Sequence, residues 1–133
     1  MLAYCPNCWS EITGTPTICR ECGTGVDVYS HEYERQMVAL LTKSDAAKRA
    51  QICLVLGERE KRSAVPHLLV LLATDPEPLV RVAVLRALSE IGDTSVVPAI
   101  TKIAATDSPP VRSIAKQVLG SLKAHDMKRH SRT

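Results

Sequence analysis

The feature that most constrains this fold is an internal repeat that begins near residue 45. The stretch VRVAVLRALSEIGD, which starts at Val80, recurs 31 residues later as VRSIAKQVLGSLK, which starts at Val111. A weaker copy, DAAKRAQICLVLGE, starts at Asp45. In the two clear copies, apolar residues recur at i, i+3, i+4, i+7, i+8 and i+11, which is the spacing of a helix with one apolar face. Each copy is therefore predicted to be a helix that buries one side.

A second kind of helix lies between the copies of the first. The stretch SAVPHLLVLLATDPEP, from Ser63, aligns with SVVPAITKIAATDSPP, from Ser95, and a degenerate version, HEYERQMVALLTKSD, starts at His31. Pro66 and Pro98 fall in the first turn, where a missing N–H costs little. The repeating unit is thus a pair of helices, and such units bury their apolar faces by stacking on their neighbours.

These segments resemble HEAT repeats, in particular the bacterial and archaeal HEAT-like repeats of the PBS-lyase type, whose consensus runs VRxxAxxALGxIGD and then AVPALIELLxDPxP. The resemblance spans about residues 45–123 and implies a short right-handed α-solenoid. Aromatic residues make up only 3% of the chain and phenylalanine is absent, so the core must be aliphatic, which also favours close-packed helices. We predict an all-α fold with about six helices, at residues 31–42, 45–57, 63–73, 78–91, 95–105 and 109–122.

Four cysteines lie ahead of the repeats, in the stretch YCPNCWSEITGTPTICRECG. They form two CxxC pairs, Cys5 with Cys8 and Cys19 with Cys22. Two such turns that face each other offer four thiolates in a tetrahedron, which is a ligand set that Zn²⁺ prefers in structural sites. We predict a structural Zn²⁺ held by all four, with no position left for a catalytic water. Iron in a rubredoxin-like site, a dithiol redox pair and the absence of any metal are the alternatives.

The cysteine segment resembles the small zinc ribbons that read CPxCG…CxxCG, over about residues 4–24. Turn residues between the two pairs predict a short hairpin, with residues 10–12 and 17–18 as its arms. Zinc knuckles usually have glycine after the second cysteine, where the backbone takes a positive φ. Gly23 fits this pattern, but the first knuckle has Trp9. Either that knuckle is strained or it closes differently, and we expect Trp9 to pack onto the helices.

The resulting domain organisation has three parts. The zinc ribbon is expected at residues 1–28, and it would cover the apolar side of the first helix. The HEAT-like repeat domain is expected at residues 29–123. The basic and polar residues 124–133 are expected to form a disordered tail.

Two further features have a plain structural interpretation. Cys53 aligns with core positions of the repeat, so it is predicted to be a buried, inert thiol, with a redox or ligand role as the alternative. His31-Glu32 is a single HE pair. Related helical-repeat hydroxylases hold two irons with several such pairs, and one pair is too few for that site.

Charged residues also recur with the repeat. Arg81 and Arg112 hold the same repeat position, as do Asp75 and Asp107. In HEAT families such residues pair along the turns between repeats, and we expect the same here. A ligand-binding arginine is the alternative.

The candidate partner-binding surface lies on the second kind of helix, off the core stripe. The resemblance implies that these helices line the concave face of the solenoid, where exposed apolar residues indicate a protein or peptide partner. The alternative is ordinary variable surface. The candidate residues are His67, Val70, Thr74, Ala99, Lys102 and Thr106.

The predicted function is a non-enzymatic protein–protein interaction scaffold with a structural zinc site. No nucleophile–base pair, paired carboxylates or glycine-rich phosphate loop is visible. The alternative is a nucleic-acid-binding protein that uses the zinc ribbon and basic residues of the repeats. The small net charge of +3 argues against it, as does Lys102 being the only Lys or Arg on residues 63–73 and 95–105. With no signal peptide, no membrane-spanning run and clustered thiols, a cytoplasmic location is expected.

Overall fold

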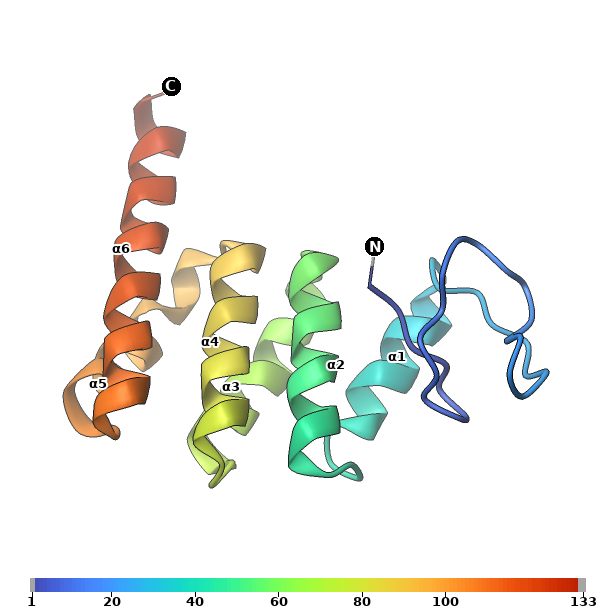
Figure 1. Cartoon of the computed structure of the whole chain (residues 1–133). Coiled ribbons are helices and arrows are strands. Elements are labelled where there is room, and N and C mark those ends of the chain that lie inside the picture. The colour runs from blue at the N-terminus through green and yellow to red at the C-terminus, as the bar shows by residue number, and fades with distance from the viewer. Residues whose placement is uncertain (1, 132–133) are drawn as a thin grey trace.

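The computed structural model describes residues 2–131, which form six α-helices and, within that range, no β-strand (Figure 1). The predicted all-α class is confirmed. Two short 3₁₀-helices, η1 (Arg62–Ala64) and η2 (Thr94–Val96), lead directly into the third and fifth helices. The α-helices are α1 (His31–Leu40), α2 (Ala46–Glu58), α3 (Val65–Thr74), α4 (Pro78–Ile91), α5 (Val97–Thr106) and α6 (Pro109–Ser131).

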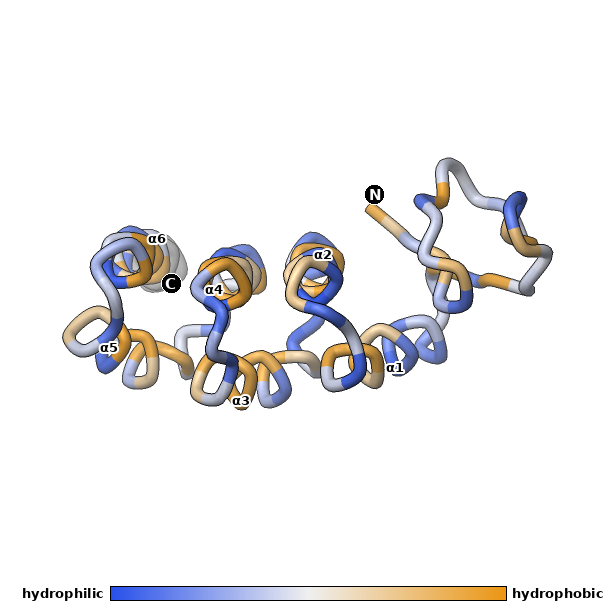
Figure 2. The backbone as a smooth tube through the Cα atoms, turned by 60° about the horizontal axis from the view of Figure 1, so that its bottom comes forward, coloured by the Kyte–Doolittle hydropathy of each residue, from blue (hydrophilic) through white to orange (hydrophobic). Residues whose placement is uncertain are grey.

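The helices lie in two layers. Figure 2 shows α1, α3 and α5, the odd layer, on one side, and α2, α4 and α6, the even layer, on the other. Helix α4 packs against α2 and α6 in its own layer and against α3 in the other, whereas the helices of the odd layer approach one another less closely. Successive helix pairs thus stack side by side, which is the architecture of a short α-solenoid.

Local sequence signals set the helix ends. The Ser30 hydroxyl accepts a hydrogen bond from the Tyr33 N–H at the start of α1, and the Asp45 side chain accepts from the Lys48 N–H at the start of α2. Both side chains satisfy backbone donors that the first helical turn leaves unpaired. Helix α4 ends at Gly92, whose φ of +74° is the left-handed conformation that glycine adopts most readily.

The core lies between the two layers and is aliphatic, as predicted. The apolar stripe of α4 is buried along its whole length, and most of the corresponding stripe of α6 is buried too. Burial of these side chains against neighbouring helices supplies the main driving force for stacking. The stripe residues that are buried are Val80, Ala83, Val84, Ala87, Leu88 and Ile91 in α4, and Val111, Ala115, Val118 and Leu122 in α6.

Helix α6 is longer than the sequence pattern predicts. It continues to Ser131 instead of ending near residue 122, so residues 124–131 of the expected disordered tail are helical. Residues 132 and 133 lie outside the described range. The stretch KAHDMKRHS contains no glycine or proline to stop a helix, so local propensity does not oppose the extension.

None of the described helices is both long enough and apolar enough to cross a membrane.

Candidate metal centre and its contacts with the helices

The structure brings the four cysteines of the N-terminal segment together. Their Sγ atoms all lie within 4.8 Å of one another, and none of the cysteines is in a disulfide. Cys5 Sγ lies 3.6 Å from Cys22 Sγ, and Cys8 Sγ lies 3.7 Å from Cys19 Sγ. A tetrahedral zinc site with Zn–S bonds of about 2.3 Å has sulfurs about 3.8 Å apart. The donor set and its spacing therefore fit one thiophilic metal ion.

Each CxxC pair sits in its own tight turn. In the first, the Cys5 N–H donates to the Ser10 carbonyl at 2.9 Å; in the second, the Cys19 N–H donates to the Thr24 carbonyl at 2.8 Å. The flanking backbone pairs within each turn, as the isolated bridges Tyr4–Glu11 and Ile18–Gly25 show. The predicted pairing of residues 10–12 with residues 17–18 is therefore wrong. The backbone bonds that close a knuckle engage the residues on its own two sides, so each arm pairs across its own turn.

The two turns close in the same way despite their different sequences. The Trp9 N–H donates to the Cys5 carbonyl, and the Gly23 N–H donates to the Cys19 carbonyl, both at 2.9 Å. Trp9 has a φ of +63°, close to the +79° of Gly23. This conformation costs a side-chain-bearing residue roughly 1–2 kcal/mol. Of the two alternatives left by the sequence, the strained knuckle is the one observed.

Trp9 joins the first knuckle to α2. Its ring stacks on Tyr4, with centroids 4.8 Å apart and the planes 11° from parallel. Its indole N–H donates to Gln51 Oε1 at 2.8 Å, and the Lys48 ammonium lies 4.5 Å from the ring centroid. Stacking, a hydrogen bond and a cation–π contact thus act on one side chain and offset the backbone strain. Packing of Trp9 onto the helices is confirmed.

Tyr33 makes a second connection, between α1 and the segment that leads into Cys5. Its side chain is buried, and its hydroxyl donates to the Tyr4 carbonyl at 2.8 Å and accepts from the Tyr4 N–H at 2.9 Å. The Arg59 guanidinium lies over the Tyr33 ring, 4.8 Å from its centroid, and donates to the Val28 carbonyl. The N-terminal module is therefore fixed to α1 through Tyr33 and to the end of α2 through Arg59.

The thiols differ in how readily they ionise. The Thr24 hydroxyl, 3.1 Å from Cys22 Sγ, lowers the pKa of that thiol to about 6, and the Ser10 hydroxyl, 3.4 Å from Cys19 Sγ, lowers the pKa of Cys19. Burial raises the pKa of Cys5 to about 11. Metal binding requires thiolates, so Cys19 and Cys22 are prepared for a cation by their hydroxyl neighbours, and the cation itself must ionise Cys5.

Ion pairs link successive helix pairs at the turns. Arg49 in α2 donates to both carboxylate oxygens of Asp75 at 2.7 and 3.2 Å, and Arg81 in α4 donates to Asp107 at 3.0 Å. The predicted pairing between repeats is confirmed for Arg81 and Asp107. Arg112 holds the equivalent place in α6, and the structure records no ion pair for it among the described residues.

The six candidate partner-binding residues are all exposed, on α3 and α5. Val70 is the most exposed of the large apolar side chains there, with 62% of its surface accessible. A groove of about 310 Å³ between α3 and α5 is lined in part by Leu69, Ala99 and Lys102. A second, of about 470 Å³ between α1 and α3, is lined in part by His67. We call this surface of α3 and α5, with its two grooves, the odd face.

Two sequence candidates remain, Cys53 and the His31–Glu32 pair. Cys53 is fully buried, as predicted, and burial raises the pKa of its thiol to about 12, which favours the protonated thiol. His31 and Glu32 are exposed at the start of α1. Among the described residues, the four N-terminal cysteines are the grouping of His, Cys, Asp and Glu that could share a metal ion.

Sequence reasoning missed several residues that hold the site in place. Arg49 could have been found, because it stands one repeat before Arg81 in the weak copy that starts at Asp45. Tyr33 and Gln51 carried no such signal, since their partners lie in the N-terminal module, far away in sequence.

Comparison with known proteins agrees with this architecture. The family described as HEAT repeats matches residues 35–120, which includes most of α1 and extends well into α6. No curated protein and no solved structure matches the chain. Since the family match covers well over half of the sequence and the helices stack as its repeats do, the chain belongs to the HEAT-repeat family.

Proposed function

We propose that this chain is a non-enzymatic scaffold that binds a segment of a partner protein on the odd face. The observation that supports this most directly is the composition of that face. Its helices α3 and α5 expose mainly small or apolar side chains and carry Lys102 as their only Lys or Arg, while the two grooves also include charged residues of neighbouring elements, such as Arg35 and Arg81. HEAT repeats commonly serve as protein-interaction scaffolds, and exposed apolar surface of this kind is typical of such sites.

The proposal is tied to these residues, and not to a concave shape. The helices of the even layer approach one another more closely than those of the odd layer. In a curved stack, the more closely spaced layer lies on the inside. This spacing argues against the concave placement that the sequence resemblance implies. The narrower PBS-lyase assignment and the right-handed twist stay predictions.

We further propose that the four cysteines hold a structural Zn²⁺. An ion bound by thiolates from both CxxC turns links the two knuckles, and four protein ligands leave no open position for a reacting water. The role of the ion is then to fix the knuckle that carries Trp9 and Tyr4 against α1 and α2. Reduced thiols in a metal site also support the predicted cytoplasmic location.

Removal of residues 1–24 tests the capping role. Without this segment, Tyr33 loses both hydrogen bonds to Tyr4, and Gln51 and Lys48 lose Trp9. We expect the melting temperature of the helical circular dichroism signal to fall. An unchanged melting temperature would show that the segment does not stabilise the repeats.

Total metal analysis of the intact chain should give one zinc per molecule.

The odd face is tested by a pair of variants that place the same charge on different layers. Val70→Glu alters the odd face, and Leu79→Glu alters α4 at a similarly exposed apolar residue, with 62% and 60% of their surfaces accessible. The tagged chain and both variants are used for affinity purification from the native cell extract, with mass spectrometry. We expect the same partner with the wild type and Leu79→Glu, and its loss with Val70→Glu. Retention by Val70→Glu would contradict the proposal.

The nucleic-acid alternative predicts a different result. A salt-dependent gel shift should appear with the wild type and should respond to Lys102→Gln but not to Val70→Glu. With a single Lys or Arg on α3 and α5, we expect no shift.

A further inference from the structure

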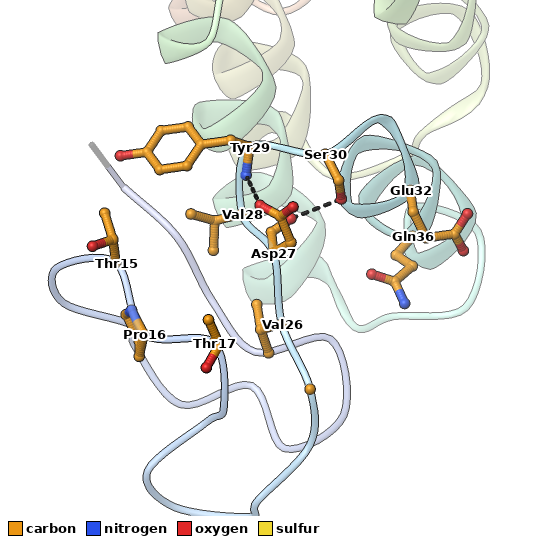
Figure 3. Close-up of a pocket in the computed structure, with 11 residues that line it drawn as sticks. Thr15, Pro16, Thr17, Val26, Asp27, Val28, Tyr29, Ser30, Glu32 and Gln36 are labelled. Carbon is orange, nitrogen blue, oxygen red and sulfur yellow. Dashed lines mark hydrogen bonds between the residues drawn. The ribbon is translucent and has the colours of Figure 1, made fainter.

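An open groove of about 550 Å³ lies between the N-terminal module and α1 (Figure 3). One wall is the loop at residues 15–17, the floor is the segment 25–30 that leads into α1, and the other wall carries Glu32 and Gln36 of that helix. Its volume is within the range of ligand sites in proteins. It lies apart from the odd face, because it shares no lining residue with either groove described there.

The apolar part of this groove suits an aliphatic chain. Val26 and Val28 are buried along the floor, and Pro16 lies beside them in the loop. Figure 3 shows the Tyr29 ring extending over the Thr15 side of the opening. The Tyr29 side chain is 62% exposed, which is unusual for so large a ring in a chain with few aromatic residues.

The charged part of the groove has one sign. Its lining residues include Asp27 and Glu32 and contain no lysine, arginine or histidine. One Asp27 oxygen accepts from the Tyr29 N–H at 3.1 Å, and Glu32 pairs with Arg35 on the next turn of α1 at 2.6 Å. Asp27 therefore accepts from a backbone amide, and no cation among the lining residues balances its charge, whereas the charge of Glu32 is balanced by Arg35.

We propose that this groove binds a basic, extended segment of a partner protein, with a lysine or arginine side chain lying across it. The aliphatic stem of such a side chain covers Pro16 and the small exposed part of Val26, while its cationic head reaches Asp27 and, in place of Arg35, Glu32. The exposed face of Tyr29 adds a cation–π contact. A groove lined by both carboxylates and aliphatic side chains fits this amphipathic side chain.

The test uses the full chain purified with its bound metal and two synthetic octapeptides, one alternating lysine with valine and one alternating glutamate with valine. Amide chemical shifts are followed by NMR during titration at low salt. We expect the lysine peptide to shift residues 15–17 and 25–36, with affinity that falls as salt is raised. The glutamate peptide should cause no shift there.

Two double variants distinguish binding in the groove from attraction by the overall charge of the protein. Asp27→Asn with Glu32→Gln keeps both side chains able to accept their present hydrogen bonds but removes both charges. Glu11→Gln with Glu21→Gln removes the same charge from exposed positions of the same module, outside this groove. The first should weaken lysine-peptide binding at least about fivefold, and the second should leave it nearly unchanged. Tyr29→Leu, which keeps bulk without a ring, should weaken it about two- to fivefold.

Three results would overturn the proposal: equal losses in the two double variants, equal binding of the two peptides, or shifts confined to the odd face. The first would indicate attraction by net charge alone. Val70 does not line this groove, and its variant is tested by partner capture, so the groove and the odd face can fail separately.

Discussion

Within residues 2–131, two residues other than glycine adopt the left-handed conformation at places where glycine stands elsewhere in the same protein. Trp9 corresponds to Gly23 in the second knuckle, and Glu60, with a φ of +53°, stands 32 residues before Gly92, at the equivalent end of α2. In both cases the surrounding hydrogen bonds hold the backbone in the conformation that glycine adopts at the equivalent place, although a side chain makes that conformation strained. For Trp9 the gain is visible, since only a side chain can reach Tyr4 and Gln51.

Replacing Trp9 with glycine should separate metal binding from packing. The backbone strain in the first knuckle is relieved, so zinc affinity should stay the same or rise. The stack, the hydrogen bond to Gln51 and the Lys48 contact are lost, so the free energy of unfolding should fall by about 1–3 kcal/mol. Competition with a chromophoric chelator measures the affinity, and thermal unfolding followed by circular dichroism measures the stability.

Gly23→Ala is the complementary control, because it adds backbone strain to one knuckle where Trp9→Gly removes it from the other. No atom lies within 4 Å of the site of an added Cβ, so the substitution adds only backbone strain, of roughly 1–2 kcal/mol, in the second knuckle. We expect weaker zinc binding and little effect on the melting of the helices once metal is saturating. The interpretation fails if Trp9→Gly weakens zinc binding more than Gly23→Ala does.

The ion pair between Arg49 and Asp75 should matter far more than an exposed pair. The Asp75 side chain is 3% exposed, and removal of its partner leaves a buried carboxylate without its counter-charge. Arg49→Met should therefore destabilise the protein by about 2–3 kcal/mol in chemical unfolding. Arg35→Met, which breaks the exposed pair with Glu32, is the matched control and should have almost no effect. Similar effects of the two substitutions would contradict a stabilising role for the buried pair.

At the scale of the element, one glycine sets how closely two helices approach. Gly57 in α2 is buried, and a Cβ placed on it would lie 2.7 Å from the Ala87 Cα atom of α4. Gly120 stands in α6, two repeats further along the chain, and a Cβ there would meet nothing within 4 Å. The same repeat position is thus tightly constrained between α2 and α4 and unconstrained in α6.

Alanine substitutions at these glycines should have opposite effects. Gly57→Ala forces the backbones of α2 and α4 apart. Overpacking of this kind lowers the free energy of unfolding by about 1–3 kcal/mol, which exceeds the gain in helix propensity. Gly120→Ala should stabilise α6 by up to about 1 kcal/mol, since only the propensity changes. Urea unfolding of both variants measures the difference. A stabilised Gly57→Ala would mean that the two helices can separate without loss of packing.

The elements that were predictable from sequence are those whose partners repeat with the chain. The stripes of α4 and α6, the proline-containing starts of α3 and α5, and the Arg81–Asp107 pair follow from periodicity, since each unit meets a copy of itself. The proximity of the four cysteines was predictable because two CxxC pairs at this spacing are typical of metal knuckles. The knuckle pairing, the end of α6 and the contacts of Tyr33 were not predictable. The end of α6 and the contacts of Tyr33 occur once in the molecule and leave no repeated pattern. The knuckle pairing occurs in both turns, but backbone groups make it and the side-chain pattern does not specify it.

At the scale of the whole molecule, contacts run from each helix pair mainly to the next. The N-terminal module meets the solenoid through α1 and α2, at one end of the molecule, while α5 and α6 lie at the other (Figure 1). In such an array stability is close to a sum of local terms and neighbour terms. A change at the metal site should therefore weaken with distance along the stack and should not act equally on all helices.

Removal of the metal should loosen the solenoid from one end. Without an ion to hold the knuckles, Tyr4 and Trp9 no longer present a fixed surface to Tyr33 and Gln51, so α1 and α2 lose partners while α5 and α6 keep theirs. We expect faster amide exchange in α1 and the first half of α2, a smaller change in α3 and α4, and none in α5. Hydrogen exchange with mass spectrometry, before and after chelation, measures this gradient.

A cysteine variant shows whether the chelator acts through the metal. Cys8→Ser removes one exposed ligand and should give the same gradient without chelator, and adding the chelator to it should change nothing further. Equal acceleration in all helices would mean that the array unfolds as one cooperative unit, because a three-pair stack is then too short for its ends to be independent. No acceleration in α1 would mean that Tyr33 and Trp9 are held by packing alone. The extent of the gradient thus measures how far one thiolate-bound ion can stabilise a row of helices that contact only their neighbours.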